Sequence, residues 1–332
     1  MLKPAESLTM PSIPSSPTVT MPPAALATKS ADKSRLLAIV LMCSATACFA
    51  VLDASAKYLA TVIHIPMLQV IWMRFLSHAG LNLIFLGPRN VLAVAKSKKP
   101  LHQILRSFFL LGATAFNFLA LQYLQLDQGA TIFFLAPFFV AALAGPMLGE
   151  WIGWRRLAAI CVGFSGVLLV TRPGFGGIHW AVSFSFCATL SFSFYNLSTR
   201  YLSRYDTSRT TLLYSPLAGA VAMAPLALPL WQTPHSLPVW LLLLSTGLSG
   251  GFGHWLLILA HARAPAPILA PFGYINIVFM ISLGLIVFGD VPSWWTLGGA
   301  AIIIGSGLYL LLRERQTSDK AGPASSATVA EG

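Results

Sequence analysis

The feature that most constrains this chain is a series of ten apolar segments, each close to the length of a membrane-spanning helix. A helix needs about 20 mostly apolar residues to cross a hydrocarbon layer of about 30 Å. Because backbone polar groups in lipid must be satisfied within each segment, the sequence predicts an all-α, polytopic membrane protein. The ten segments are 36–61, 66–86, 104–124, 129–148, 154–171, 178–199, 210–231, 238–260, 266–288 and 294–312.

The composition excludes several other classes of protein. Charged residues make up only 9% of the 332 residues, and hydrophobic residues make up 56%. A soluble domain carries about 25% charged residues, so a soluble enzyme, a disordered chain and a disulfide scaffold are all excluded. Residues 1–34 and 314–332 differ in composition and are predicted to be cytoplasmic tails, the first of them disordered. The sequence has no Cys/His cluster with metal-ligand spacing, and we expect no metal and no cofactor.

The positions of the positive charges predict the orientation. If the N-terminus is cytoplasmic and the segments alternate, 18 of the 21 Lys and Arg residues fall on the cytoplasmic side. This distribution obeys the positive-inside rule, with both termini in the cytoplasm of a bacterial cell whose inner membrane holds the chain. The net charge of +11 is therefore explained by the orientation of the chain in the membrane. We expect the lipid bilayer, and no nucleic acid, as a partner.

An internal repeat runs through the chain. ATACFAVLDASAKYLATV (45–62) shares six identical positions with ATLSFSFYNLSTRYLSRY (188–205) at an offset of 143, which places Asp53 opposite Asn196. GEWIGWRRL (149–157) matches GDVPSWWTL (289–297) at an offset of 140.

These matches predict two five-helix halves, 35–173 and 174–313. Because five is odd, the second half enters the membrane in the opposite direction. Inverted repeats are typical of transporters, in which two halves rock about a central site.

Several motifs carry a resemblance to a known family. They are FAVLDASAKYLA (49–60), WMRF (72–75), ALQYLQLDQGATIFFLAPFFVAALAGPMLGE (120–150), LAPFGYINIVFM (269–280) and GGAAIIIGSGLYLL (298–311). With these motifs the chain resembles the drug/metabolite transporter superfamily, in the branch with two EamA-type repeats. The resemblance implies a small-molecule substrate moved by alternating access.

The resemblance also bears on the substrate. The Asp-Lys-Tyr-Leu and Trp-Met-Arg-Phe pattern is most similar to small-metabolite uptake members, and it favours riboflavin. S-adenosylmethionine uptake and amino-acid or drug efflux are the alternatives. An intramembrane enzyme or a receptor is disfavoured, because no acid–base constellation stands at one depth and no loop is long enough for a soluble domain. The coupling ion and the direction of transport stay open.

Three charged side chains within the spans are candidates for a substrate cavity or gate: Asp53, Lys57 and Arg74. An ionisable side chain near the centre of a span costs at least about 2.5–3.5 kcal/mol. Lys57, one turn after Asp53, is either an end residue that reaches water with Asp53 as its partner or part of an outer gate. Arg74 lies about 12 Å below the outer surface. It either forms a structural ion pair with Asp53 or serves the substrate or gate.

Neutral hydrogen-bonding and aromatic side chains form a second group of candidates. Each is a candidate helix contact, and together they would suit a cavity for a flat heterocycle. His254 is either a hydrogen-bonded residue between helices or a donor or proton acceptor in the cavity. The group consists of Asn117, Gln122, Tyr195, Asn196, His254, Trp255, Tyr274 and Asn276.

Prolines and glycines inside the spans suggest where helices bend or approach closely. Pro137 and Pro271 each free a backbone carbonyl, and they either border the site or mark packing kinks. The last span contains several glycines, which permit close helix contact and allow a homodimer as one interpretation. These glycines are Gly298, Gly299, Gly305 and Gly307.

Overall fold

The computed structural model describes residues 24–148, 154–171, 179–264, 269 and 272–321, and these residues form helices with no strand among them. The all-α prediction is therefore confirmed. The first part of the chain contains α1 (Ala24–Thr61), α2 (Met67–Leu86), η1 (Pro88–Asn90), α3 (Val91–Val94), α4 (Pro100–Leu121), α5 (Leu126–Phe133), α6 (Ala136–Leu148) and α7 (Trp154–Thr171). The second contains α8 (Ala181–Leu202), α9 (Ser208–Tyr214), α10 (Leu217–Ala222), α11 (Ala224–Ala227), η2 (Leu228–Leu230), α12 (Leu237–His261), α14 (Asn276–Leu283), the π-helical η3 (Gly284–Phe288) and α15 (Trp294–Ala321).

Each of the ten apolar segments overlaps at least one of these helices. By length and composition, five stretches are sufficient to cross a membrane. They are Leu36–Thr61, Pro100–Leu121, Leu126–Leu143, Ser208–Leu230 and Leu237–His261. The remaining apolar helices are shorter or less apolar, so the total of ten spans stays a prediction.

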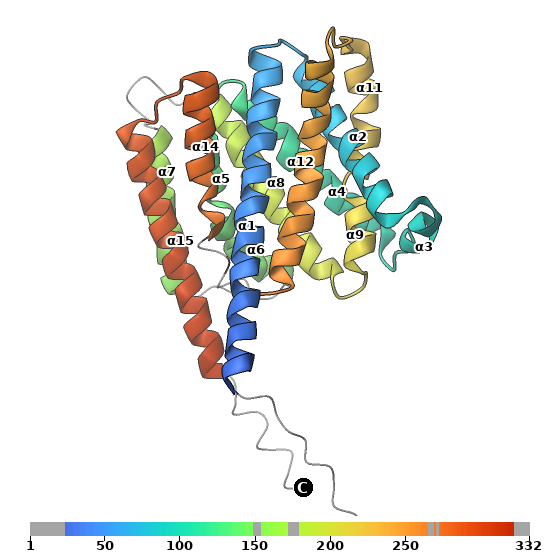
Figure 1. Cartoon of the computed structure of the whole chain (residues 1–332). Helices are drawn as coiled ribbons and strands as arrows, with labels where there is room; N and C mark the ends of the chain where they lie inside the picture. The colour runs from blue at the N-terminus through green and yellow to red at the C-terminus, as the bar shows by residue number, and fades with distance from the viewer. Residues whose placement is uncertain (1–23, 149–153, 172–178, 265–268, 270–271, 322–332) are drawn as a thin grey trace, which may run out of the picture.

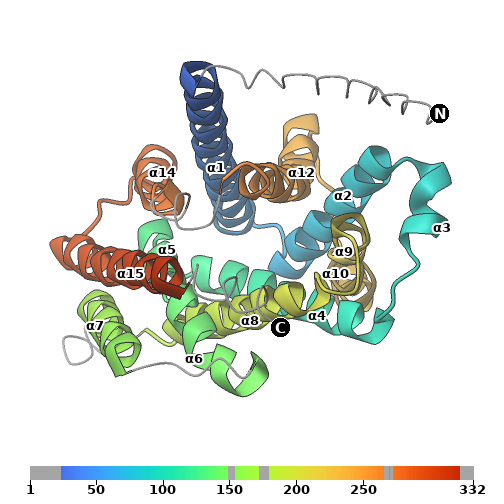
Figure 2. The same cartoon turned by 90° about the horizontal axis from the view of Figure 1, so that it is seen from below.

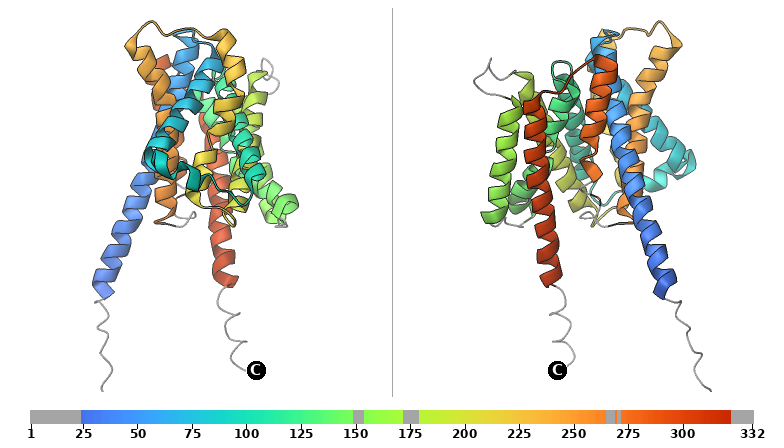
Figure 3. Two further views of the ribbon diagram at one scale, coloured as in Figure 1. Left: turned by 90° about the vertical axis from the view of Figure 1, so that its right-hand side faces the viewer. Right: turned by 60° about the vertical axis from the view of Figure 1, so that its left-hand side comes forward.

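The helices run roughly side by side in one bundle, and α1 begins at the same face of the molecule where α15 ends (Figures 1 and 3). Seen from that face, α7 and α15 form a pair at one edge, outside the other helices (Figure 2). An even number of passages between the start of α1 and the end of α15 accounts for this arrangement.

The contacts between helices follow the repeat predicted from the sequence. In that repeat α1 corresponds to α8, and α4 corresponds to α12. The structure packs α1 against α12 and α8 against α4, which are equivalent pairs. It also packs α1 against α14 and α8 against α5 and α6, a second equivalent set. The pair α7–α15 joins two corresponding helices, and α5 packs against α14, which belongs to the corresponding span of the second half. The two halves therefore pack against each other through equivalent contacts, as expected for two repeats related by a pseudo-twofold axis.

Two spans are interrupted at equivalent positions. A turn at Phe134 and Leu135 separates α5 from α6, and a turn at Tyr274 and Ile275 precedes α14. The offset of 140 places Phe134 opposite Tyr274, and the two rings touch edge to face with centroids 5.1 Å apart. The sequence suggested only a regional equivalence of these bends, whereas the structure places both breaks at matching positions and in contact.

The prolines expected at the bends have different outcomes. Pro137 is the second residue of α6, just after the turn, where its missing N–H costs no helical hydrogen bond. Pro271 lies outside the described residues.

A glycine face on α12 fixes the position of α2. A Cβ atom on Gly247 would overlap Ser77 Oγ and the carbonyl oxygen of Arg74, and one on Gly251 would press on the His78 ring. Small residues let two backbones approach closely in a membrane, where packing drives helix association. The close contact holds the backbone of Arg74 against α12.

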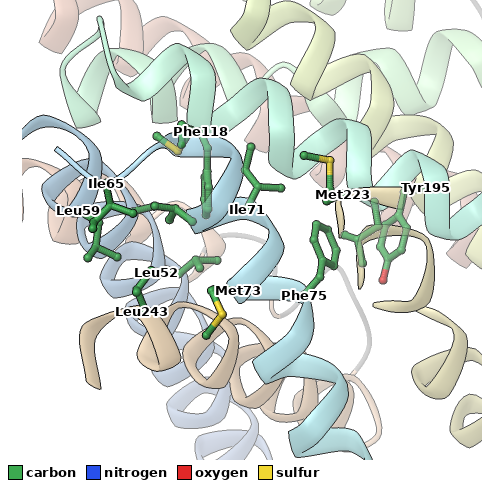
Figure 4. Close-up of a cluster of buried hydrophobic side chains, with 14 residues drawn as sticks. Leu52, Leu59, Ile65, Ile71, Met73, Phe75, Phe118, Tyr195, Met223 and Leu243 are labelled. Carbon is green, nitrogen blue, oxygen red and sulfur yellow. The ribbon is translucent and has the colours of Figure 1, made fainter. Parts of the chain in front are cut away.

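Apolar side chains pack around α2 on several sides (Figure 4). Leu52 of α1, Met73 of α2 and Leu243 of α12 belong to one buried cluster. Phe75 lies on the side of α2 toward Met223 and Tyr195 in the same cluster. The polar side chains of α2, among them Arg74 and His78, are buried and have little access to lipid.

Two of the four glycines of the last span make close contacts within the chain. A Cβ atom on Gly299 would overlap the carbonyl oxygen of Gly166, so α15 and α7 touch through their backbones. Gly307 lies against the Tyr274 hydroxyl. The homodimer suggested from these glycines stays a prediction.

Candidate functional site

A cavity of about 680 Å³ lies at the centre of the bundle, between the two halves. Side chains of α1, α2, α4, α5 and α6 line it from the first half, and those of α8, α12 and α14 line it from the second. Pockets of about 300–1,000 Å³ hold small organic ligands. The cavity is therefore large enough for a small metabolite.

The cavity opens toward the face where α1 begins. Its lining on α1 runs from Asp53 back to Met42, and these twelve residues span about 16 Å along a helix. Arg200 in the last turn of α8 and His261 at the end of α12 also line the cavity, and both side chains are exposed. Their exposure places the mouth of the cavity at that face.

A partly buried ion pair lies beyond the other end of the cavity. Lys57 Nζ lies 3.2 Å from Asp290 Oδ2 and donates a 2.9 Å hydrogen bond to the carbonyl oxygen of Leu124. The ammonium group also lies 4.8 Å from the centre of the Phe288 ring. These contacts tie the end of α1 to the turn after α4 and to the link after η3. The partner of Lys57 is therefore Asp290, which corrects the expectation that Asp53 would pair with it.

Asp53 lies one turn deeper, within the cavity wall. Asn117 Nδ2 of α4 donates a 3.0 Å hydrogen bond to Asp53 Oδ1, and both residues line the cavity. Asn196, which the repeat places opposite Asp53, lines the cavity from α8 and donates to the carbonyl oxygen of Phe192 at 3.0 Å. The repeat therefore contributes one equivalent polar residue from each half.

Arg74 of α2 is 2% exposed and also lines the cavity. Its Nε and Nη1 atoms are buried without a hydrogen-bond partner, and its guanidinium lies 4.3 Å from the centre of the Phe75 ring. No carboxylate oxygen of Asp53 comes within ion-pair distance of it, although the two charges act on each other. The expected structural ion pair between Asp53 and Arg74 is thus not formed as a direct contact.

Arg106 of α4 is a second buried arginine, again 2% exposed, that sequence reasoning did not single out. Its Nε donates to Thr199 Oγ1 at 2.6 Å, and its Nη2 donates to the Tyr195 hydroxyl at 2.7 Å. Its Nη1 donates to the Thr211 carbonyl oxygen and to Ser215 Oγ at 3.2 and 3.1 Å. Arg106 therefore has neutral partners for all three nitrogens, and it lies outside the cavity lining.

His254 of α12 lines the cavity with its ring held between two neighbours. The Phe49 ring meets it edge to face at 5.1 Å, and the His78 ring stacks on it at 6.0 Å. Both nitrogens of His78 are buried without a partner. Of the two alternatives for His254, the contact between helices takes the form of ring packing, and its role as a donor or proton acceptor in the cavity stays a prediction.

Aromatic rings form a further part of the cavity wall. Phe133 and Phe192 pack at 4.8 Å, and Phe134 packs against Tyr274. Asn276, at the start of α14, lines the same cavity, and its Oδ1 atom is buried without a partner. A flat ring system bound here would meet ring faces and an amide, as the sequence analysis expected.

The remaining candidates lie elsewhere. Gln122 caps the end of α4, Tyr195 is engaged by Arg106, and Trp255 packs against Phe85 and Phe252. None of the three belongs to the cavity lining, whereas Pro137 does. The phenylalanines of the cavity were not proposed individually, but the LAPFF run that supplies the α5–α6 break was a usable signal.

Outside the membrane-spanning helices, Asp206 joins two loops at the face where the cavity opens. Its carboxylate accepts hydrogen bonds from Ser97 Oγ, the Lys98 backbone N–H and Gln103 Nε2. Partial burial raises the pKa of Asp206, but these hydrogen bonds and the Lys98 charge outweigh it and hold the pKa below its usual value. These hydrogen bonds hold the loop between α8 and α9 against the segment before α4.

The family model described as EamA-like transporter family matches residues 36–172 and again residues 179–313. The chain belongs to this family. Curated relatives in it include an S-adenosylmethionine uptake transporter of Rickettsia felis, 27% identical over 271 residues, or 81% of this chain and 90% of the relative. A riboflavin transporter of Vibrio cholerae is 27% identical over 278 residues, or 83% of this chain and 93% of the relative.

A solved crystal structure shares the fold. It superposes with a TM-score of 0.55 at 18% sequence identity, over 87% of this chain and 99% of that one. Together with the apolar helices, the family identifies a multi-pass membrane protein of the transporter class.

Proposed function

We propose that this family member is a secondary transporter that takes up a small, ring-bearing metabolite across the bacterial inner membrane by alternating access. The observation that carries the proposal is a cavity built by both halves, open at one end and with the Lys57–Asp290 ion pair beyond the other. Two similar halves that rock about such a cavity expose it to each side in turn.

The positive-inside distribution supports a cytoplasmic position for both ends of the chain. With that orientation the cavity of this structure faces the cytoplasm, and Lys57 and Asp290 close the outer side. Transport then requires the ion pair to separate and the inner mouth near Arg200 and His261 to close.

The walls of the cavity support a ring-bearing substrate. Aromatic side chains offer ring faces for stacking, and Asn117, Asn196 and Asn276 offer amide groups for ring edges. The two relatives named above are a riboflavin transporter and an S-adenosylmethionine transporter, and both of these solutes contain a flat heterocycle. The sequence favours riboflavin, and S-adenosylmethionine is the second candidate.

The test is uptake into proteoliposomes that contain the purified full-length chain, with labelled riboflavin and labelled S-adenosylmethionine offered separately. We expect one of them to accumulate chemically unchanged and to saturate with concentration. Phe134→Ala should reduce this uptake several-fold, whereas the matched Phe252→Ala, outside the cavity lining, should not. Chemical conversion of either solute without uptake would overturn the proposal in favour of an enzyme.

A further inference from the structure

The contrast between the two buried arginines points to a ligand site. Arg106 and Arg74 are equally buried, but only Arg106 has hydrogen-bond partners for its three nitrogens. A buried donor without a partner costs about 1–3 kcal/mol, and more when it is charged. Because Arg74 lines the cavity, an acceptor brought in by a ligand can supply what the chain does not.

The chemistry of the missing acceptor follows from the guanidinium group. Arginine donates through a planar fork that matches carboxylate and phosphate groups, and such charge-assisted hydrogen bonds are about twice as strong as neutral ones. The Arg74 guanidinium carbon lies over the Phe75 ring at 4.3 Å, a cation–π contact that leaves the buried Nε and Nη1 atoms without a hydrogen-bond acceptor. An anion on the ligand is the group that best satisfies this site.

Asp53 supplies the opposite charge in the same cavity. Among the contacts of the described residues, its carboxylate accepts one side-chain hydrogen bond, from Asn117 to Oδ1, and forms no ion pair. The acid and the base therefore share one cavity without neutralising each other by direct contact. A ligand that carries both a negative and a positive group would provide a partner of opposite charge for each of the two side chains.

We propose that the cavity binds a metabolite with a zwitterionic amino-acid head group, whose carboxylate lies on Arg74 and whose cationic group lies toward Asp53. The proposal rests on the transport function proposed above and names the substrate class of the same cavity. S-adenosylmethionine has such a head group, with an additional sulfonium, while riboflavin has none. The charges therefore favour the first of these solutes, although the sequence pattern favours the second.

Competition with the wild-type chain tests the head group without any variant. Labelled S-adenosylmethionine is offered to proteoliposomes together with S-adenosylhomocysteine, which keeps the amino-acid head, or 5′-methylthioadenosine, which lacks it. We expect S-adenosylhomocysteine to inhibit uptake at least tenfold more strongly than 5′-methylthioadenosine or riboflavin. Equal inhibition by the headless compound overturns the proposal. Uptake of riboflavin but not of S-adenosylmethionine also overturns it while the transport function stands, and uptake of neither solute contradicts both.

Variants assign the two charges to the two ends of the head group. Arg74→Gln should raise KM for S-adenosylmethionine at least tenfold, about 1.4 kcal/mol, with unchanged inhibition by 5′-methylthioadenosine. Arg74→Lys should recover part of the loss, and Asp53→Asn should weaken S-adenosylmethionine and S-adenosylhomocysteine alike, because both carry the ammonium group of the head. Arg263→Gln, at an exposed arginine in the turn after α12 that donates to Leu259 O, is the matched control. An unchanged KM in folded Arg74→Gln contradicts the proposal, and if that variant does not fold, the wild-type competition decides.

Discussion

Replacing each buried arginine by methionine should have opposite effects on stability. Methionine keeps most of the side-chain volume and removes the charge and all hydrogen bonds. Arg106→Met deletes the four hydrogen bonds to Thr199, Thr211, Ser215 and Tyr195. Side-chain hydrogen bonds between membrane helices average about 0.6 kcal/mol and reach about 1.7. The loss should therefore be about 2–4 kcal/mol.

Arg74→Met deletes no protein hydrogen bond from Nε or Nη1, because neither atom has a partner. It removes buried unsatisfied donors, and replacing buried charge by an apolar side chain of similar volume is often neutral or stabilising. It also removes the attraction to Asp53, which offsets part of the gain. We expect the ligand-free protein to be unchanged or up to about 2 kcal/mol more stable.

The assay is thermal unfolding of the purified full-length chain in detergent without substrate, followed by size-exclusion chromatography. The reasoning predicts a lower unfolding midpoint for Arg106→Met and an equal or higher one for Arg74→Met. Arg263→Met, at an exposed position, should stay within about 0.5 kcal/mol of wild type. Equal destabilisation by Arg74→Met and Arg106→Met would falsify the idea that Arg74 awaits a ligand.

Three further predictions concern other contacts. Lys57→Met and Asp290→Asn each leave a partly buried partner unpaired, so each should lower stability by about 1–3 kcal/mol; the double variant should lose less than the sum, and additivity in a double-mutant cycle would argue against the ion pair. Gly247→Ala should lower the unfolding midpoint because its Cβ would overlap Ser77 and Arg74, by about 1–3 kcal/mol, whereas Gly80→Ala, with nothing within 4 Å of its Cβ, should be neutral or stabilising. The pKa of Asp206 is lower in the folded than in the unfolded protein, so its carboxylate contributes stability above about pH 4 that is lost as the pH falls through the folded-state pKa. The unfolding midpoints of wild type and Asp206→Asn should therefore converge at acidic pH. A constant difference between the two midpoints down to about pH 2 would be evidence against this linkage.

The sequence predicted the helices well because membrane burial imposes a long apolar run on each span. The structure places Asp53, Arg74, Asn117, Asn196, His254, Tyr274 and Asn276 along one cavity, and their role in substrate binding or gating stays a prediction. Intramembrane polar groups face the protein interior because lipid offers them no partner. Depth along a helix is readable from residue counting, and this is why Arg74 could be located.

Partners across the bundle could not be predicted. Lys57 and Asp290 are 233 positions apart, and their contact depends on how the two halves dock. The side of a helix that faces the cavity cannot be predicted from the sequence where all sides of the helix are apolar. For this reason Trp255 and Gln122 were proposed for the cavity, whereas the structure places them outside its lining. Arg106 was missed because it lies in the first turn of the predicted span 104–124 and was counted among the cytoplasmic charges, whereas α4 begins one turn earlier, at Pro100.

The contact between Phe134 and Tyr274 has a consequence for motion. The two residues correspond to each other in the repeat, so their contact maps onto itself when the halves are interchanged. The Lys57–Asp290 contact has no such property, since interchange carries it to the opposite end of the molecule. If the conformational cycle exchanges the shapes of the two halves, the ring pair keeps the same partner throughout. Phe134 and Tyr274 would then form a fixed pivot between the two halves, while the contacts at both mouths of the cavity break and form in every cycle.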